Sequence, residues 1–309
     1  GGRLYVCGGN DCKGMLSAAE CFDPSVGAWQ MLPAMARPRS FAFAAVLEGR
    51  VYVGGGCTLQ AARLRQGGQA VTRAAKGSKQ DLVALGSLER FDPTHRVWQL
   101  LPPMAQARYS CTAAVLGGRL YACGGTDEHE LSSVERFDPA VEAWQRQPPM
   151  LHRRAFACHA SLFGSLYLCG GVDTPVRWRA VERLDPEAER WQAAPPMTVE
   201  RVGAVAAASR AGRLFVCGGC SAQARCGLEA FSPGADAWEA LAGERLQLQG
   251  MVSGVLVANR LYVFGGSQLG DAPERRLGGA GCLDLATGRW EALPEMPTPR
   301  RSVLVGVLA

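Results

Sequence analysis

The sequence is poor in histidine and has no long apolar run. It contains four histidines in 309 residues, whereas a copper centre needs clustered imidazoles and tyrosines. No stretch of about eighteen residues is apolar throughout, so no membrane-spanning helix and no membrane partner are expected. The first residues, GGRLYVCGG, lack the charged region, the apolar region and the cleavage site of a secretory signal peptide. These absences argue against a copper enzyme, a membrane protein and a leader at this point of the sequence.

Groups that could perform catalysis or hold a metal are scattered. Three histidines fall in predicted turns or loops: His95, His129 and His152. The fourth, His159, lies in a predicted strand and is interpreted as a packing variant. No Ser-His-Asp order or Cys-His pair is recognisable, and Cys217, Cys220 and Cys226 lack an obvious fourth zinc ligand. We therefore expect no enzymatic activity, no catalytic residue, no metal and no cofactor.

Glycine, proline and cysteine are abundant. Thirty-eight glycines and eighteen prolines indicate many turns, and there are twelve cysteines. Four cysteines stand directly before a Gly-Gly pair: Cys7, Cys123, Cys169 and Cys217. The same placement in separate segments indicates one packing role, since free cysteine behaves as a small buried hydrophobe. Reduced cysteines favour a cytoplasmic location, with the nucleus as the alternative.

The sequence is built from six repeats. Each repeat has a glycine pair: Gly8-Gly9, Gly55-Gly56, Gly124-Gly125, Gly170-Gly171, Gly218-Gly219 and Gly265-Gly266. A tryptophan follows each pair: Trp29, Trp98, Trp144, Trp191, Trp238 and Trp290. Consecutive pairs are 46 to 48 residues apart, except for one step of 69 residues between the second and third. We predict a structural role for these glycines and tryptophans, with the tryptophans packed between neighbouring repeats.

Four short strands are expected in every repeat. A strand such as RLYVC precedes the glycine pair, a second ends in Asp-Pro, a third holds the tryptophan, and a fourth has small residues, as in YSCTAAVL. Asp-Pro is typical of turns, and no helical period is present. The pattern predicts an all-β fold, a six-bladed β-propeller.

The chain begins and ends within one repeat. The C-terminal RRSVLVGVLA followed by the N-terminal GGRLYVCGG matches one continuous stretch of the third repeat. The C-terminal strand is therefore expected to complete the blade that the N-terminus opens. The expected domain is a single propeller over residues 1–309, with these blades: 301–309 with 1–35, 36–104 with an insertion at about 57–84, 105–150, 151–197, 198–245 and 246–300.

These repeats resemble the Kelch repeat. The likeness is carried by the glycine pair after a tyrosine-containing strand, the Glu-x-Phe-Asp-Pro segment, the tryptophan, and the Pro-Arg-Ser before the small-residue strand. It extends over essentially the whole chain. A WD40 propeller is the alternative architecture, but its repeats are shorter and carry a Trp-Asp pair that is absent here.

An arginine and a glutamate also recur. The arginine is expected at Arg39, Arg108, Arg154, Arg201 and Arg301, with Gln249 in its place in one repeat. The glutamate is found at Glu20, Glu89, Glu135, Glu182 and Glu229. Recurrence favours a structural role for both, and it argues against paired catalytic carboxylates. Binding of an acidic ligand by the arginines is the alternative.

If the strands of a blade are labelled A to D from the centre, the D–A and B–C loops share one face. Loops that vary on a repeated scaffold are where binding is usually found, and the B–C loops vary most in length. Two rings of residues point to this face. One follows the glycine pairs: Asn10, Cys57, Thr126, Val172, Cys220 and Ser267. The other follows the arginines: Ser40, Tyr109, Ala155, Val202, Gly250 and Ser302. The Kelch resemblance implies that these positions, with Arg153 and Arg177 from neighbouring loops, bind a partner.

The insertion of the second blade is basic. It contains Arg63, Arg65, Arg73, Lys76 and Lys79 against Asp81. A solvated surface segment is one interpretation, and a flap for an acidic peptide is the other, since clustered charge steers association. Further charge on the same face is expected from Arg153, Arg154, Arg177, Arg179, Arg275, Arg276, Arg300 and Arg301. No aromatic-rich basic groove is evident, so nucleic acid is not the expected partner.

The resemblance implies a protein-protein interaction module. Many Kelch proteins carry a BTB module before the propeller and act as cullin-3 ubiquitin-ligase substrate adaptors, so cullin-3 is an expected partner through a BTB region that this sequence does not contain. An actin, cytoskeletal or signalling scaffold is the alternative. A Kelch-type oxidase or sugar-acid isomerase is the remote alternative.

Overall fold

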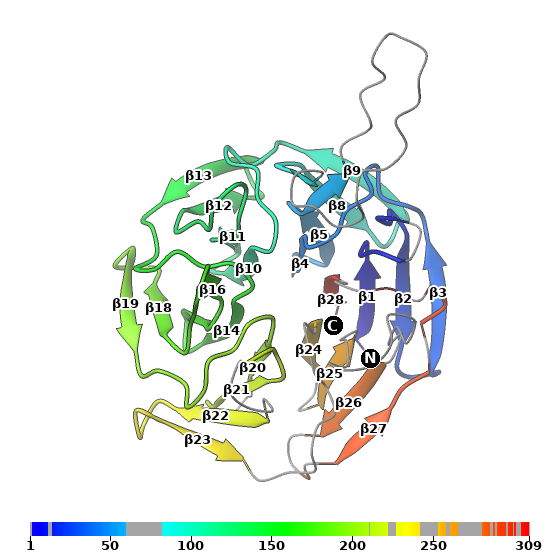
Figure 1. Ribbon diagram of the computed structural model, residues 1–309. Coiled ribbons are helices and arrows are strands. Elements are labelled where there is room, and N and C mark those ends of the chain that lie inside the picture. Colours follow the sequence, from blue (N-terminus) through cyan, green and yellow to red (C-terminus); the bar gives the residue numbers. More distant parts are fainter. Residues whose placement is uncertain are drawn as a thin grey trace, which may run out of the picture.

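The computed structural model is all-β over the residues that it describes. These are residues 2–11, 14–59, 82–209, 211–221, 227–241, 253–257, 260–264, 280–284, 287, 289–294, 296–298, 300 and 304–308. No helix among them is long and apolar enough to cross a membrane. Six four-stranded antiparallel sheets surround a central axis and form the blades of a propeller (Figure 1).

The first three blades follow one order from the axis outward. Blade 1 consists of β28 (Leu304–Leu308), β1 (Arg3–Cys7), β2 (Ala19–Asp23) and β3 (Ala28–Leu32). Blade 2 consists of β4 (Phe43–Leu47), β5 (Arg50–Gly54), β8 (Leu88–Asp92) and β9 (Val97–Leu101). Blade 3 consists of β10 (Thr112–Leu116), β11 (Arg119–Cys123), β12 (Val134–Asp138) and β13 (Ala143–Gln147).

The other three blades repeat this order. Blade 4 consists of β14 (Cys158–Leu162), β15 (Ser165–Cys169), β18 (Val181–Asp185) and β19 (Arg190–Ala194). Blade 5 consists of β20 (Val205–Ala208), β21 (Leu214–Cys217), β22 (Leu228–Ser232) and β23 (Ala237–Leu241). Blade 6 consists of β24 (Ser253–Val257), β25 (Arg260–Phe264), β26 (Ala280–Asp284) and β27 (Trp290–Ala292). Two hairpins stand outside the blades: β6 (Cys57–Leu59) with β7 (Leu82–Ala84), and β16 (Val172–Asp173) with β17 (Val176–Arg177).

The turns have the chemistry that the sequence indicates. Between β10 and β11, Leu116 pairs with Arg119, and the two intervening glycines have φ of 55° and 70°; these are left-handed conformations that glycine adopts without strain. At the outer turn of blade 2, Asp92 Oδ1 accepts hydrogen bonds from the backbone N–H of Thr94 at 2.9 Å and of His95 at 3.1 Å. These bonds stabilise the carboxylate and lower the pKa of Asp92 to about 2.

The core lies between neighbouring blades, and the repeat tryptophans join them. Trp144 of blade 3 packs against a cluster that includes Tyr52 and Met104 of blade 2. Its Nε1 donates to the carbonyl of Pro102 at 3.0 Å. Tryptophans of other blades repeat this bond to a proline carbonyl of the preceding blade: Trp29, Trp98, Trp191 and Trp238. The predicted packing between blades is confirmed, although Trp191 is buried and the other repeat tryptophans are half-buried.

The glycine pairs lie where two blades touch. A Cβ atom on Gly124 would lie 2.4 Å from the backbone oxygen of Arg154, and a Cβ atom on Gly125 would lie 2.7 Å from that of Tyr109. The two glycines also have φ of 61° and 90°. Both space and conformation therefore demand glycine. Gly265-Gly266 lies outside the described residues.

Each repeat arginine is buried against the repeat glutamate of its own blade. Arg39 Nη2 lies 2.6 Å from Glu89 Oε1, and its Nη1 donates to the carbonyl of Gly55 at 2.8 Å. The backbone carbonyl of Arg39 accepts from Gly9 N of the preceding blade at 2.9 Å. The other pairs are Arg108 with Glu135, Arg154 with Glu182, Arg201 with Glu229, and Arg300 with Glu20. The arginines and glutamates thus fasten strands within a blade and blades to one another.

In blade 1 this arginine is Arg300, so the expectation of Arg301 was wrong. Arg300 Nη1 donates to the carbonyl of Gly8 at 3.1 Å. Strand pairing gives the reason: Leu308 pairs with Arg3, and counting through the two ends of the sequence places three positions between them, whereas two positions separate the paired strand ends in blades 2, 3 and 4. Counting back with the two-residue turn therefore reached the wrong neighbour. Arg301 itself lies outside the described residues.

Candidate functional site

The two predicted rings meet on one face of the propeller. Ser40 pairs with Cys57 in a short antiparallel β-bridge, and equivalent bridges join Tyr109 to Thr126, Ala155 to Val172, and Val202 to Cys220. A residue from a D–A loop therefore lies beside a residue from a B–C loop in each of blades 2 to 5. We call the surface formed by these pairs and their loops the ring face. Gly250, Ser267 and Ser302 lie outside the described residues.

The ring positions differ in what they offer to a partner. Ser40, Cys57 and Ala155 are no more than 1% exposed, so the expectation that their side chains touch a partner is corrected: small residues here pack the bridge. Thr126 is 9% exposed. The half-buried ring residues are Asn10, Tyr109, Val172, Val202 and Cys220. Burial raises the pKa of Tyr109, so its hydroxyl is held as a neutral hydrogen-bonding group.

Arg153 and Arg177 are exposed beside these rings. Arg177 belongs to the hairpin of β16 and β17, where it pairs with Val172. The hairpin is tied to the neighbouring loop of blade 3, because Thr174 Oγ1 donates to Glu130 Oε1 at 2.7 Å. The loops of blades 3 and 4 therefore form one continuous part of the ring face.

Trp178 is a residue of this face that sequence reasoning missed. It follows β17, it is half-buried, and its ring centroid lies 4.6 Å from that of His152. His152 Nδ1 lies 2.8 Å from Glu182 Oε1, which also accepts from Arg154. Trp178 is the only tryptophan of the seven outside the repeat position, and that exception was the available signal. The contact fixes the base of the hairpin to the D–A loop.

The charge expected on this face is reduced by burial. Arg154 and Arg300 are no more than 1% exposed and are paired with glutamates, so their expected contribution to a basic surface is corrected. The described B–C loop of blade 3 is acidic, with Asp127, Glu128 and Glu130. Of the insertion, β6 and β7 are described, and its basic residues from Arg63 to Lys79 lie outside the described residues, as do Arg275 and Arg276.

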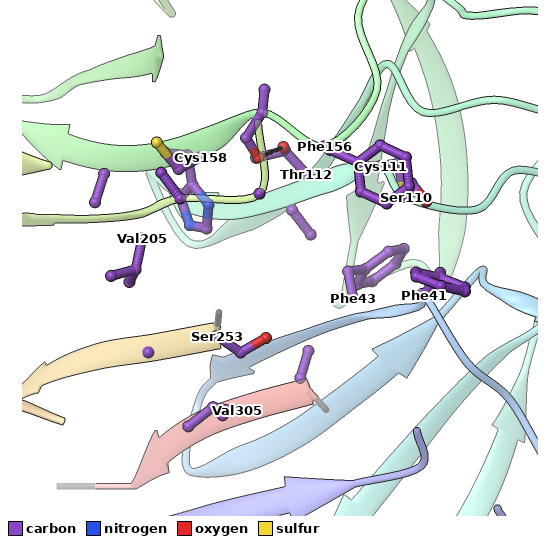
Figure 2. Close-up of a pocket in the computed structure, with 18 of the residues that line it drawn as sticks. Phe41, Phe43, Ser110, Cys111, Thr112, Phe156, Cys158, Val205, Ser253 and Val305 are labelled. Carbon is purple, nitrogen blue, oxygen red and sulfur yellow. Dashed lines mark hydrogen bonds between the residues drawn. The ribbon is translucent and has the colours of Figure 1, made fainter. Parts of the chain in front are cut away.

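The ring face opens at its centre into a cavity at the mouth of the propeller channel. The cavity has a volume of about 190 Å³ and is lined by residues at the starts of the innermost strands and just before them, among them Phe41, Phe43, Phe156 and His159. Figure 2 shows the phenylalanines on one side of this space and Val205, Ser253 and Val305 on the other. We call this cavity the vestibule.

The titratable side chains of the described residues are dispersed or buried. No group of three or more His, Cys, Asp or Glu side chains among them is placed to hold a metal ion. The ten cysteines that the structure describes are free thiols, all buried except Cys220. Burial raises the pKa of the Cys7 thiol to about 12, which makes it a poor nucleophile.

Comparison with known proteins finds a repeat motif in blades 3 and 4. The model of the Kelch motif matches residues 107–151 and 153–198. Kelch-like protein 33 of Homo sapiens is 29% identical over 135 residues, which are 42% of this chain and 21% of that protein. Kelch repeat and BTB domain-containing protein 13 of Homo sapiens is 30% identical over 125 residues, which are 40% of this chain and 22% of that protein. The match therefore spans about a fifth of the length of each relative.

A solved structure agrees with the fold. The structure of YjhT superposes with a TM-score of 0.71, over 94% of this chain and 97% of that chain, at 16% identity. At this identity the likeness extends to the fold alone. It agrees with the six-bladed propeller described above.

Proposed function

The chain belongs to the Kelch-repeat propeller family, and we propose that it is a protein-interaction module that binds a partner protein or peptide on the ring face. The observation that carries this proposal is the set of β-bridges between D–A and B–C loops, which gathers residues far apart in sequence onto one surface. Tyr109, Val202, Arg153 and Arg177 stay accessible there. Tyrosine and arginine are residues on which binding energy often concentrates. The proposal assigns no catalysis to the chain.

We propose further that the propeller is the substrate-recognition part of a cullin-3 ubiquitin-ligase adaptor. Support comes from a relative whose name includes a BTB domain. The Kelch resemblance implies that adaptors of this kind engage cullin-3 through their BTB module. The partner would then be a substrate protein with an acidic flank, attracted by the basic residues of the insertion.

A cytoplasmic location is part of the same proposal. Nine described cysteines are buried free thiols, and proteins with many unpaired cysteines are typical of reducing compartments. Localisation of the tagged full-length protein by microscopy tests this directly, and entry into the secretory pathway would contradict it.

The test compares two double variants in affinity capture with the purified propeller. Tyr109→Ala with Arg153→Ala removes exposed groups from the ring face. Val141→Ala with Phe163→Ala is the matched control, because these side chains are 67% and 77% exposed on turns of the opposite face. We expect the first variant to weaken capture of directly bound proteins at least tenfold and the control to leave it unchanged, with equal melting temperatures.

Equal losses in both variants, or in neither, would contradict the ring face as the binding surface. Co-precipitation of cullin-3 with the full-length protein tests the adaptor role separately. Co-sedimentation of the propeller with filaments, unaffected by the ring-face variant, would favour a cytoskeletal scaffold instead.

A further inference from the structure

Blade 5 carries serine at a position where the other blades carry aspartate. Ser232 ends β22 and begins the turn to β23, as Asp92 does between β8 and β9 in blade 2 (Figure 1). The equivalent aspartates are Asp23, Asp92, Asp138, Asp185 and Asp284. The pairing at the turn is the same, because Ser232 pairs with Ala237 as Asp92 pairs with Val97. The exchange therefore removes a carboxylate and keeps the backbone around it.

The position favours a negative charge in the other blades. Asp138 Oδ1 accepts a hydrogen bond from the backbone N–H of Ala140 at 3.0 Å, and this bond lowers the pKa of Asp138. In blade 5 the equivalent N–H belongs to Gly234. Ser232 is half-buried, and the turn residues from Gly234 to Ala237 are exposed. An anionic group on Ser232 would therefore find a backbone donor of the same kind beside it.

The arginine that faces this position is kept in blade 5. Arg213 and Ser232 stand opposite each other, immediately beyond the last pair of the ladder between β21 and β22. In blade 3, Arg119 Nε donates to Asp138 Oδ2 at 3.0 Å. Arg213 pairs instead with Glu239, and its Nε makes no hydrogen bond to the residues that the structure describes. Blade 5 thus has the cation of this pair without the anion.

The arginine is able to change its partner. The side chains of Arg213 and Glu239 are 34% and 58% exposed, and exposed ion pairs contribute little to stability. A phosphate group carries nearly two negative charges and can bind a guanidinium through two hydrogen bonds. Asp236 in the same turn opposes a further negative charge. The pair with Arg213 is therefore the contact on which a phosphate at this position would depend.

The residue after Ser232 is a proline. Serine followed by proline is the minimal signal that proline-directed protein kinases recognise, and Ser232-Pro233 is the one Ser-Pro dipeptide of the sequence. Two Thr-Pro dipeptides begin at Thr174 and Thr298. Both lie in loops on the side of the ring face, whereas the turn after Ser232 lies on the opposite side.

We propose that Ser232 is a phosphorylation site for a proline-directed protein kinase, and that its phosphate takes the place of the turn aspartate by pairing with Arg213. The phosphoryl donor is ATP. A bond forms between Ser232 Oγ and the γ-phosphorus while the bond from that phosphorus to the ADP oxygen breaks, and the hydroxyl proton passes to the catalytic base of the kinase. The modification would stabilise the outer turn of blade 5, independently of the function proposed for the ring face.

The first experiment incubates the folded propeller with ATP and, in turn, a mitogen-activated and a cyclin-dependent protein kinase. Phosphorylated peptides are mapped by tandem mass spectrometry. We expect phosphate on Ser232, lost in Ser232→Ala and kept in Thr298→Ala. A synthetic peptide of residues 227–241 shows whether each kinase recognises the sequence. Phosphorylation of the peptide without the folded protein, or of neither by both kinases, would overturn the inference.

A second experiment tests the pairing on a propeller synthesised with phosphoserine at position 232. Phosphoserine ordinarily has a second pKa of about 6, and a nearby cation should lower it by about half a pH unit or more. Titration followed by ³¹P NMR measures this pKa. Arg213→Met should return it to about 6, whereas Arg3→Met, which breaks the pair with Asp23 in blade 1, should leave it low. An ordinary pKa, or one that Arg213→Met leaves low, would overturn the pairing.

Ser232→Asp tests the same position without a phosphate. It restores the carboxylate of the other blades and should raise the melting temperature by about 1–2 °C. Adding Arg213→Met should remove that gain. Capture of partners on the ring face should be the same for both variants, so a failure here is distinct from a failure of the proposed function. A melting temperature that Ser232→Asp lowers or leaves unchanged would contradict a site for an anion in this turn.

Discussion

At the scale of the residue, this scaffold depends on buried arginine–glutamate pairs. Arg108 and Glu135 are no more than 2% exposed, and they lie 2.8 Å apart. Glu135 also accepts from the backbone N–H groups of Ala105 and Gln106. Two charges taken out of water cost several kcal/mol each, and only mutual pairing with further hydrogen bonds offsets that cost. Either partner alone would be a buried, uncompensated charge.

Replacing Arg108 with methionine should therefore lower the free energy of unfolding by about 3–5 kcal/mol. Arg119→Met in the same blade is the control, because Arg119 pairs with Asp138 at the surface, and exposed pairs contribute about 0–1 kcal/mol. Urea denaturation of both variants measures the difference. Adding Glu135→Leu to Arg108→Met should restore part of the loss, and a loss that stays equal or grows would contradict the explanation from an unpaired charge.

His159 makes folding stability depend on pH in a predictable window. Burial lowers its pKa to about 4, from about 6.5 in an unfolded chain. Since the unfolded chain binds the proton more readily, the stability linked to His159 is complete above about pH 6.5 and is lost as pH falls towards 4. Between pH 7.5 and pH 5 the native protein should lose about 2 kcal/mol more than His159→Ala does. Parallel denaturation curves at the two pH values would contradict this.

At the scale of the element, the strand that carries the repeat tryptophan holds its blade against the preceding blade. Trp144 packs on the Tyr52 and Met104 side of blade 2 and donates to the carbonyl of Pro102. Because it is half-buried, Trp144→Ala should cost about 3 kcal/mol, at the low end for large aromatic deletions. Trp144→Phe keeps most of the packing and loses the hydrogen bond, which is worth about 1 kcal/mol.

Thermal or urea unfolding of the two variants tests this contribution. Val97→Ala, at a position 53% exposed on β9, should change stability by less than about 0.5 kcal/mol. If Trp144→Ala resembled Val97→Ala, the tryptophan would not hold the blades together.

The repeated elements were predictable from the sequence, because every blade makes the same packing contacts with the same residue types. Glycine pairs, tryptophans and the four-strand pattern gave the fold and the placement of the two rings on one face. The burial of Ser40, Cys57 and Ala155 was not predictable, since a ring position says nothing of how closely its neighbours pack. The position of Arg300 was misassigned because the number of residues outside one ladder differs between blades. The contact between Phe41 and Phe156 depends on how three successive blades curve around the axis. The spacing of residues within a repeat does not predict that curvature.

At the scale of the whole molecule, the first and last strands close the circle. β28 pairs with β1 through five residues, from Leu304 with Cys7 to Leu308 with Arg3. Gly306 of β28 also lies against blade 2, since a Cβ atom there would be 3.3 Å from Val46. The innermost strand of blade 1 therefore comes from one end of the sequence and its neighbour from the other, side by side in Figure 1.

Removing residues 304–309 should open the ring. The loss of about five ladder hydrogen bonds at roughly 1 kcal/mol each, together with the apolar contacts of β28, amounts to a large share of the stability of an ordinary domain. The edge of β1 would also be left unpaired, which promotes association between chains. Size-exclusion chromatography and thermal melting should show oligomers and a broad, early transition. A monomer with an unchanged melting temperature would show that β28 is dispensable.

The backbone around the channel mouth is held by main-chain hydrogen bonds, so its structure does not depend on the side chains that it carries there. Main-chain hydrogen bonds hold positions 41, 110, 156 and 203, and these positions already carry phenylalanine, serine, phenylalanine and glycine. Side chains there can be exchanged while the strands behind them stay in register. Substitutions at these four positions should therefore alter the surface around the channel mouth while the blades behind it keep their fold.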